Sequence, residues 1–157
     1  MTTFTTDEQY FIAFRQWAND RNLIQGSSEA PQFVKLTEEL SELDDDVKDA
    51  IGDAYVVMTI LCAQRGINLE DVDCQPVNQL DFYRALLVAL GEIANGVARN
   101  KDITKGVGRM KDLMQYYAYL NQIPLLECLD TAWLEIKDRK GRMIDGVFVK
   151  EADLEAA

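Results

Sequence analysis

One apolar stretch in the first half of the chain constrains the fold more than any other feature. Residues Ala54 to Ala63 are apolar nearly all round, and they belong to a helical pattern that runs from about Val47 to Arg65 and stops at Gly66. A helix with apolar side chains on every side is normally buried among other helices. We therefore expect this segment to be the central helix of a bundle.

Amphipathic helical patterns flank this stretch. One runs from about Asp7 to Arg21 behind the N-cap candidate Thr6. Another runs from about 32 to 43, with apolar residues at helical spacing, namely Phe33, Leu36, Leu40 and Leu43. Strand-like alternation is confined to 146–149. The sequence predicts an all-α fold, an antiparallel bundle of about five to seven helices in a single domain over residues 1–157.

Residues 81–121 look like a second, degenerate copy of the helix pair at about 32–65. Shifts of 50 and 56 positions align apolar residues of the two segments, for example Leu36 with Leu86 and Met58 with Met114. The difference of six predicts a longer loop, from Asn95 to Ile103. An internal repeat explains the similarity, and so does the shared periodicity of amphipathic helices. A C-terminal helix and a basic tail at about 126–151 complete the predicted domain.

Charge and cysteine usage exclude several classes of partner and compartment. With 16 basic and 27 acidic residues the formal net charge is −11, which disfavours binding to a nucleic-acid backbone. The sequence contains no run of about 18 apolar residues, so we expect no membrane span, and the N-terminus has no signal-peptide pattern. The three cysteines form no C-x-x-C pair, as expected for reduced thiols. We expect a cytoplasmic protein without nucleic-acid or membrane partners.

The chain contains no histidine. This excludes Ser-His and Cys-His nucleophiles, imidazole general bases and histidine-containing zinc sites. Any metal must be bound by oxygen, which favours Mg²⁺, Mn²⁺ or Ca²⁺.

Carboxylates gather near the junction of the helix pair at 32–65. Glu38, Glu39 and Glu42 crowd one side of the first helix, and Asp49 and Asp53 are four residues apart at the start of the second. A divalent cation makes such crowding beside a buried surface tolerable. A solvated acidic face explains the glutamates alone, but Asp53 leads directly into the apolar stretch and favours a metal site.

These carboxylates resemble the signature of the MazG-like, all-α nucleoside triphosphate pyrophosphohydrolase superfamily, which includes the dimeric dUTPases. In that superfamily E-x-x-E on one helix and E-x-x-D on the next hold Mg²⁺. Glu39 and Glu42 match the first half, and Asp53 matches the closing residue of the second. Ala50 stands at the remaining ligand position, and Asp49, one residue earlier, is the nearest substitute.

Two other segments are similar to small phage-type members of the superfamily. Residues 17–36 look like their N-terminal pattern, and 135–150 look like their R-K-G…G-V-F-x-K ending. Leu134 departs from this pattern, because such members often have Asn there. The resemblance covers about 10–72 and 130–151.

The resemblance implies attack of water on the α-phosphorus of a nucleoside triphosphate, with a deoxynucleotide as the expected substrate and the monophosphate and pyrophosphate as products. It implies one or two Mg²⁺ ions, replaceable by Mn²⁺, held by Glu39, Glu42 and Asp53 with Asp49 or Glu38. Glu38 is also the candidate proton acceptor. The same resemblance implies a homodimer or homotetramer, located in the host cytoplasm if the protein is phage-encoded.

Cationic side chains are expected near the leaving phosphates. The first choice is the tail cluster of Lys137, Arg139, Lys140 and Arg142, although a solvated basic helix end explains it equally well. Lys105, Arg109 and Lys111 are a second option. Further candidates for substrate binding are Lys35, Gln32 and Arg21.

Three other functions fit parts of the sequence. A non-catalytic acidic helical interaction protein and a nucleotide-binding regulator both predict binding without turnover. A Ca²⁺-binding regulator would use residues 68–73, which carry oxygen ligands but lack the Gly and the bidentate Glu spacing of an EF-hand loop.

Overall fold

The computed structural model describes residues 1–77 and 81–156. Within these ranges the chain forms seven α-helices, one short 3₁₀ helix and one β-hairpin, which confirms the all-α prediction. In chain order the elements are α1 (Asp7–Asp20), α2 (Glu29–Ser41), α3 (Val47–Ala63), η1 (Leu69–Asp71), α4 (Phe82–Arg99), α5 (Thr104–Leu120), α6 (Leu125–Ile136), β1 (Gly141–Ile144), β2 (Val147–Lys150) and α7 (Glu151–Glu155).

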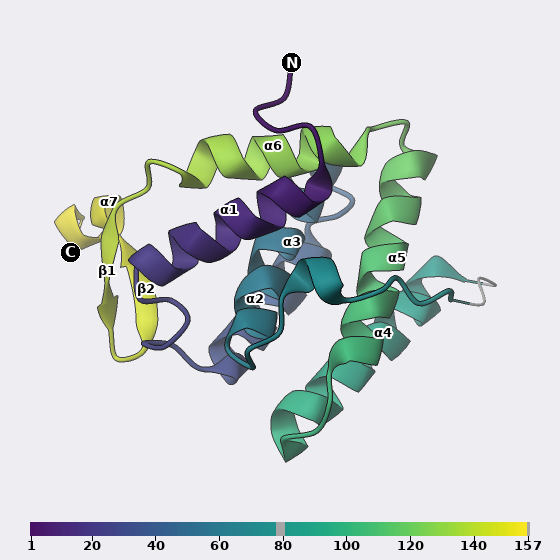
Figure 1. Cartoon of the computed structure of the whole chain (residues 1–157), viewed down its shortest axis with the longest axis horizontal. Helices are drawn as coiled ribbons and strands as arrows, with labels where there is room; N and C mark the ends of the chain where they lie inside the picture. Colours follow the sequence, from purple (N-terminus) through teal and green to yellow (C-terminus); the bar gives the residue numbers. More distant parts are fainter. Residues whose placement is uncertain (78–80, 157) are drawn as a thin grey trace.

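Helix α3 is the centre of the fold, as its apolar stretch predicts. Every residue from Ala50 to Cys62 is buried except Asp53. Helices α1, α2, α5 and α6 all contact α3, and Figure 1 shows α1 and α6 on one side of it and the α4–α5 pair at the other end. The single charge in this helix centre is therefore placed where burial makes it costly.

Several helix boundaries differ from the sequence prediction, and α2 ends at Ser41 rather than about Leu43. Helix α2 begins at Glu29 rather than about Gln32, with Pro31 in its first turn, where backbone N–H groups have no intrahelical partner and proline costs little. Helix α3 ends at Ala63 rather than Arg65. The capping prediction for α1 is confirmed, because Thr6 forms a capping box with Gln9.

The predicted long loop between the second pair of helices is wrong. Helix α4 continues to Arg99, and only residues 100–103 link it to α5. Asn100 ends α4 in the left-handed conformation, with φ 51°, which is a common helix terminus. The additional residues therefore lengthen the helix, because Ile93 and Gly96 keep the buried helical spacing through this segment.

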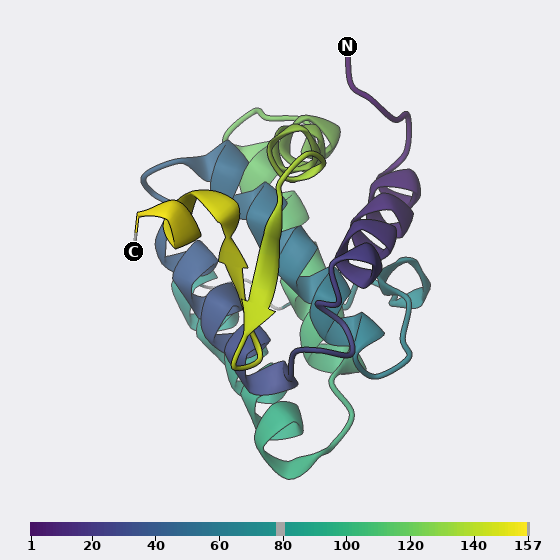
Figure 2. The same ribbon diagram turned by 90° about the vertical axis from the view of Figure 1, so that its left-hand side faces the viewer.

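The C-terminal tail folds back over the end of α1. Strands β1 and β2 pair antiparallel, with Met143 opposite Phe148, and Asp145 and Gly146 at the turn both have positive φ, as a two-residue hairpin turn requires. The Phe148 ring meets the Trp17 ring of α1 edge-on. Figure 2 shows the hairpin and α7 on one face of the helices. No helix in the described ranges has the length and apolarity needed to cross a membrane.

Gly52 allows α3 and α6 to approach closely. A Cβ atom at this position would lie 2.3 Å from the carbonyl oxygen of Cys128 and 2.9 Å from the Cβ of Ala132. Both contacts are shorter than real Cβ contacts, and one of them is with backbone. The approach fixes how α6 lies along the first turns of α3.

Gly52→Ala is therefore expected to lower the free energy of unfolding by about 1–3 kcal/mol, the usual cost of overpacking. Thermal unfolding followed by circular dichroism measures it. Gly91→Ala is the matched control, because a Cβ there meets nothing within 4 Å and alanine favours an exposed helix by roughly 0.5–1 kcal/mol. Equal melting temperatures for the two variants would contradict the close approach.

Candidate metal centre

Carboxylates from two helices, α3 and α6, converge beside the buried half of α3. One oxygen from each of Asp49, Asp53 and Glu135 lies within 4.8 Å of the other two. Asp49 and Asp53 are one turn apart on α3, and Glu135 comes from the last turn of α6. We call these three residues the acidic triad. Oxygen ligands around a single Mg²⁺ or Mn²⁺ have separations of this order, since each lies roughly 2 Å from the ion.

Burial and mutual repulsion perturb the acids of this region. Burial, followed by the charges of Glu39, Asp49 and Glu135, raises the pKa of Asp53 to about 7. The pKa of Asp49 is raised by burial and then by Glu135, and that of Glu39 is raised chiefly by burial. A divalent cation would stabilise the ionised forms, so the donor set fits such an ion.

The glutamates of α2 occupy two different environments. Glu39 is buried, with 8% of its surface exposed, and its charge raises the pKa of Asp53. Glu38 and Glu42 are exposed, and Glu42 follows the last residue of α2. Glu42 still acts on the pKa of both Glu39 and Asp49, so it lies at the edge of the site. The structure thus places Glu39 close enough to the acidic triad to act on Asp53, while Glu38 and Glu42 are exposed.

Glu135 was not among the predicted site residues. It lies far from the other acids along the chain, and no helical spacing relates it to Asp53. Glu135 belongs to the tail segment that is similar to phage-type proteins, and this was the available signal. In that segment only the basic residues were assigned a function. Its position depends on the close packing of α6 against α3 at Gly52.

Arg139 connects the acidic triad to the basic tail. Its Nη2 donates to Oε1 of Glu135 at 2.7 Å, and its charge lowers the pKa of Asp53 against the other influences. Lys35 is the other predicted cation at the site, with its Nζ 3.7 Å from Oε1 of Glu39. Each of these two cations already pairs with a carboxylate of the site.

Arg21 has a structural role. Its guanidinium donates to the carbonyl oxygens of Arg139 at 2.7 Å and of Lys137 and Trp17 at 3.3 Å, and it lies 4.9 Å from the centroid of the Trp17 ring. It holds the chain that leaves α6 against the end of α1. The sequence alone predicted substrate binding for Arg21, whereas these contacts assign its donors to the backbone.

A basic cavity of about 560 Å³ opens next to Arg139. Its lining comes from the end of α1, the segment after α6, and α7, and consists of Asp20, Arg21, Arg139, Lys140, Gly141, Arg142, Glu151 and Leu154. We call it the basic pocket. It brings together three of the four predicted tail cations, while Lys137 is exposed and outside the lining.

Gln32 is buried on α2. Its Nε2 donates to the Ser27 hydroxyl at 3.5 Å, and within residues 1–77 and 81–156 its Oε1 has no hydrogen-bond partner. Ligand contact for Gln32 remains a prediction.

Two of the three cations of the second set, Arg109 and Lys111, contribute to the fold, while Lys105 is exposed. Arg109 forms an ion pair with Glu92. Lys111 is buried, and its Nζ donates to the carbonyl oxygens of Leu69 at 3.1 Å and Val72 at 2.6 Å. These carbonyls belong to the segment considered for Ca²⁺, so the ammonium group already binds two of its backbone oxygens.

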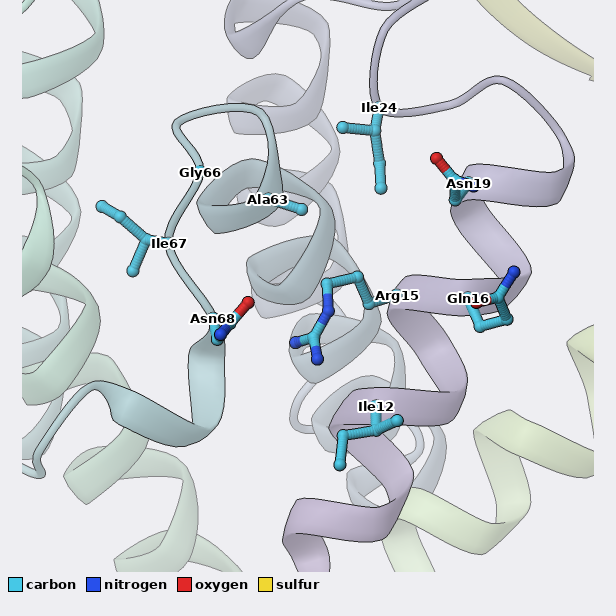
Figure 3. A pocket seen from close by; sticks show the side chains of 9 residues that line it. All are labelled: Ile12, Arg15, Gln16, Asn19, Ile24, Ala63, Gly66, Ile67 and Asn68. Carbon is cyan, nitrogen blue, oxygen red and sulfur yellow. The ribbon is translucent and has the colours of Figure 1, made fainter.

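Another cavity, of about 340 Å³, lies between α1 and the chain that follows α3 (Figure 3). Its lining includes Ile12, Arg15, Ala63 and Asn68. Arg15 is engaged there by both carboxylate oxygens of Glu70. Ala63 is ten residues beyond Asp53, about 15 Å along the helix, so this cavity is separate from the acidic triad.

Comparisons with known proteins give one partial likeness. No protein-family model matches the chain, and no solved structure matches it. A segment of 69 residues is 44% identical to the "Uncharacterized 18.2 kDa protein in rep-hol intergenic region" of Haemophilus phage HP1 (strain HP1c1). The match covers 39% of this chain and 42% of that protein, so it spans less than half of the relative's length. This chain is therefore similar, over that segment, to a phage protein whose name states no activity.

Proposed function

We propose that the protein is a Mg²⁺-dependent nucleoside triphosphate pyrophosphohydrolase, which converts a nucleoside triphosphate, preferentially a deoxynucleotide, to the monophosphate and pyrophosphate. The observation that carries the proposal is the acidic triad of Asp49, Asp53 and Glu135, with buried Glu39 beside it and a basic pocket next to it. Acids without a cation would be costly at this position, and cations next to a divalent site suit a polyphosphate.

Each group at the site has a chemical role in this proposal. Asp49, Asp53 and Glu135 would hold the ion, with Glu39 as a further ligand, and the ion would polarise a phosphate oxygen and orient the attacking water. A carboxylate outside the triad would accept the proton of that water. Glu38, which is exposed on α2 next to Glu39, is the candidate for this role.

The proposed assembly is a homodimer or homotetramer. Large apolar side chains are exposed on the outer faces of α4 and α5, namely Tyr83, Leu87, Val88, Tyr119 and Leu120. Such a surface supports self-association. The proposed location is the cytoplasm, that of a bacterial host if the protein is phage-encoded, and the three free cysteines are compatible with a reducing compartment.

A product assay tests the reaction. The purified protein is incubated with each common NTP and dNTP, in Mg²⁺, Mn²⁺ or EDTA, and the products are resolved by ion-exchange chromatography. Monophosphate and pyrophosphate, formed only with metal, are the expected products. Nucleoside diphosphate with orthophosphate would mean attack at the γ-phosphorus and would reject the proposal. A folded protein without turnover on any nucleotide would favour the non-catalytic interaction or regulatory alternative.

A further inference from the structure

We propose that the basic pocket binds the terminal phosphates of a polyphosphate chain, and that the Glu135–Arg139 ion pair couples this binding to the metal centre. This inference rests on the proposed function for its substrate, but the pocket and the ion pair are properties of the chain itself. The ligand class is an inorganic or nucleotide-borne di- or triphosphate.

The charge of the pocket is opposite to that of the whole chain. Its lining carries four cations, Arg21, Arg139, Lys140 and Arg142, and two acids, Asp20 and Glu151, a local net charge of 4 − 2 = +2. The whole chain has a net charge of −11. A concave, locally positive surface on an acidic protein attracts a compact anion, while the overall charge repels a long nucleic-acid backbone.

The four cations of the pocket differ in how many of their donors the fold already uses. Arg21 donates three hydrogen bonds to backbone carbonyls and so holds the pocket wall in place. Lys140 and Arg142 form no ion pair and donate no side-chain hydrogen bond to any part of the chain that the structure describes. An ammonium and a guanidinium group suit phosphate oxygens, the latter through bidentate contacts.

Arg139 belongs to both sites. It lines the basic pocket, and its Nη2 lies 2.7 Å from Oε1 of Glu135, a member of the acidic triad. A divalent cation at the triad would draw on the same carboxylate that now pairs with Arg139. The guanidinium would then be released toward the pocket, where it can meet an anion.

This shared residue explains why a polyphosphate fits better than a single phosphate or a carboxylate. A short anion would contact either the metal centre or the pocket. A chain of two or three phosphates has several anionic groups, so one end can bind an ion on the triad while the other meets Arg139 and the pocket that it lines. Metal and polyphosphate should then raise each other's affinity by the same factor, as thermodynamic linkage requires.

Isothermal titration calorimetry with pyrophosphate, tripolyphosphate and orthophosphate tests the inference, in EDTA and at fixed free Mg²⁺. Pyrophosphate and tripolyphosphate are expected to bind at least about fivefold more tightly with Mg²⁺, and orthophosphate only weakly. Lys140→Gln and Arg142→Gln should each weaken binding about tenfold, the loss expected for one charge-assisted contact. Lys101→Gln is the matched control, since Lys101 is exposed and lies in the α4–α5 link.

Arg139→Gln tests the coupling. The variant should bind pyrophosphate weakly, and its affinity should change less between EDTA and Mg²⁺ than that of the unaltered protein. Its melting temperature, measured in parallel, shows whether it is folded. Unchanged pyrophosphate affinity in Lys140→Gln and Arg142→Gln would overturn the pocket assignment, and full Mg²⁺ dependence in folded Arg139→Gln would overturn the coupling.

The two proposals fail in different ways. If the protein hydrolyses triphosphates but Lys140→Gln and Arg142→Gln leave both KM and pyrophosphate affinity unchanged, the pocket assignment is wrong and the reaction stands. If pyrophosphate binds with the expected Mg²⁺ dependence and variant losses but no nucleotide is hydrolysed, the pocket stands and the reaction is wrong. A comparison of tripolyphosphate with a nucleoside triphosphate distinguishes a free polyphosphate ligand from a nucleotide tail.

Discussion

Asp53→Asn is expected to lower kcat for triphosphate hydrolysis by on the order of 100-fold or more, because it removes one of the three carboxylates of the acidic triad. The same substitution should stabilise the metal-free protein at neutral pH, since burial and three neighbouring carboxylates oppose ionisation of this group. Loss of activity together with a gain in stability is the combined result that a purely structural residue would not produce. Steady-state kinetics and thermal unfolding in EDTA measure the two effects.

The control for this variant is Asp73→Asn, which makes the same charge change at an exposed position after η1. It should leave kcat and the melting temperature nearly unchanged. Glu135→Gln should resemble Asp53→Asn in activity, because its carboxylate belongs to the same triad. Full activity of Asp53→Asn would exclude a metal site at this position.

Local periodicity explains which parts of the fold the sequence could predict. The all-round apolar pattern of 54–63 identified the central helix, and the capping residues identified the start of α1. The loop before α5 was mispredicted because the six-residue difference between the two alignment shifts was assigned to a loop, whereas these residues extend α4 and Gly96 is buried within it. A buried glycine at a helix contact and a loop glycine have the same sequence signal.

The candidate site was predictable only where its residues are close in sequence. Asp49 and Asp53 share one helix face by spacing alone, and the short link to α2 brings Glu39 near them. Glu135 joins them through the packing of α6 on α3, which depends on Gly52 and has no periodic signature. Likewise, the sequence marks the charge of Arg21 but not that backbone carbonyls take up its donors.

The stability of the metal-free protein is expected to fall as pH rises from about 5 to about 7. The folded-state pKa of Asp53 is about 7, against 3.8 as the ordinary value, so between these values the folded protein holds a proton that the unfolded chain has released. Stability therefore decreases with pH in this window, by at most about 1.4 kcal/mol per unit for one group. Above about pH 7 Asp53 is ionised in both the folded and the unfolded chain, so its effect on stability no longer changes with pH. The raised pKa values of Glu39 and Asp49 act in the same direction.

Acids with lowered pKa values affect the stability of the protein in a lower pH range. Hydrogen bonds from Arg15 lower the pKa of Glu70, and those from Thr104 lower the pKa of Asp102. Their stabilisation is present above the unfolded pKa and is lost as pH falls through the folded pKa, below about pH 4.5. The decline expected between pH 5 and 7 lies above this range, so it reports on Asp53.

Thermal unfolding at pH 5, 6, 7 and 8, in EDTA and in Mg²⁺, measures this dependence. In EDTA the melting temperature should fall by several degrees across the series, since about 1 kcal/mol corresponds to roughly 2–4 °C for a chain of this size. Mg²⁺ should restore it at pH 7 and 8 and have little effect at pH 5, where the proton already neutralises Asp53. The decline in EDTA should be much smaller in Asp53→Asn. A melting temperature that rises with pH in EDTA, or an equal decline in Asp53→Asn, would mean that Asp53 is not the group that makes the metal-free protein sensitive to pH.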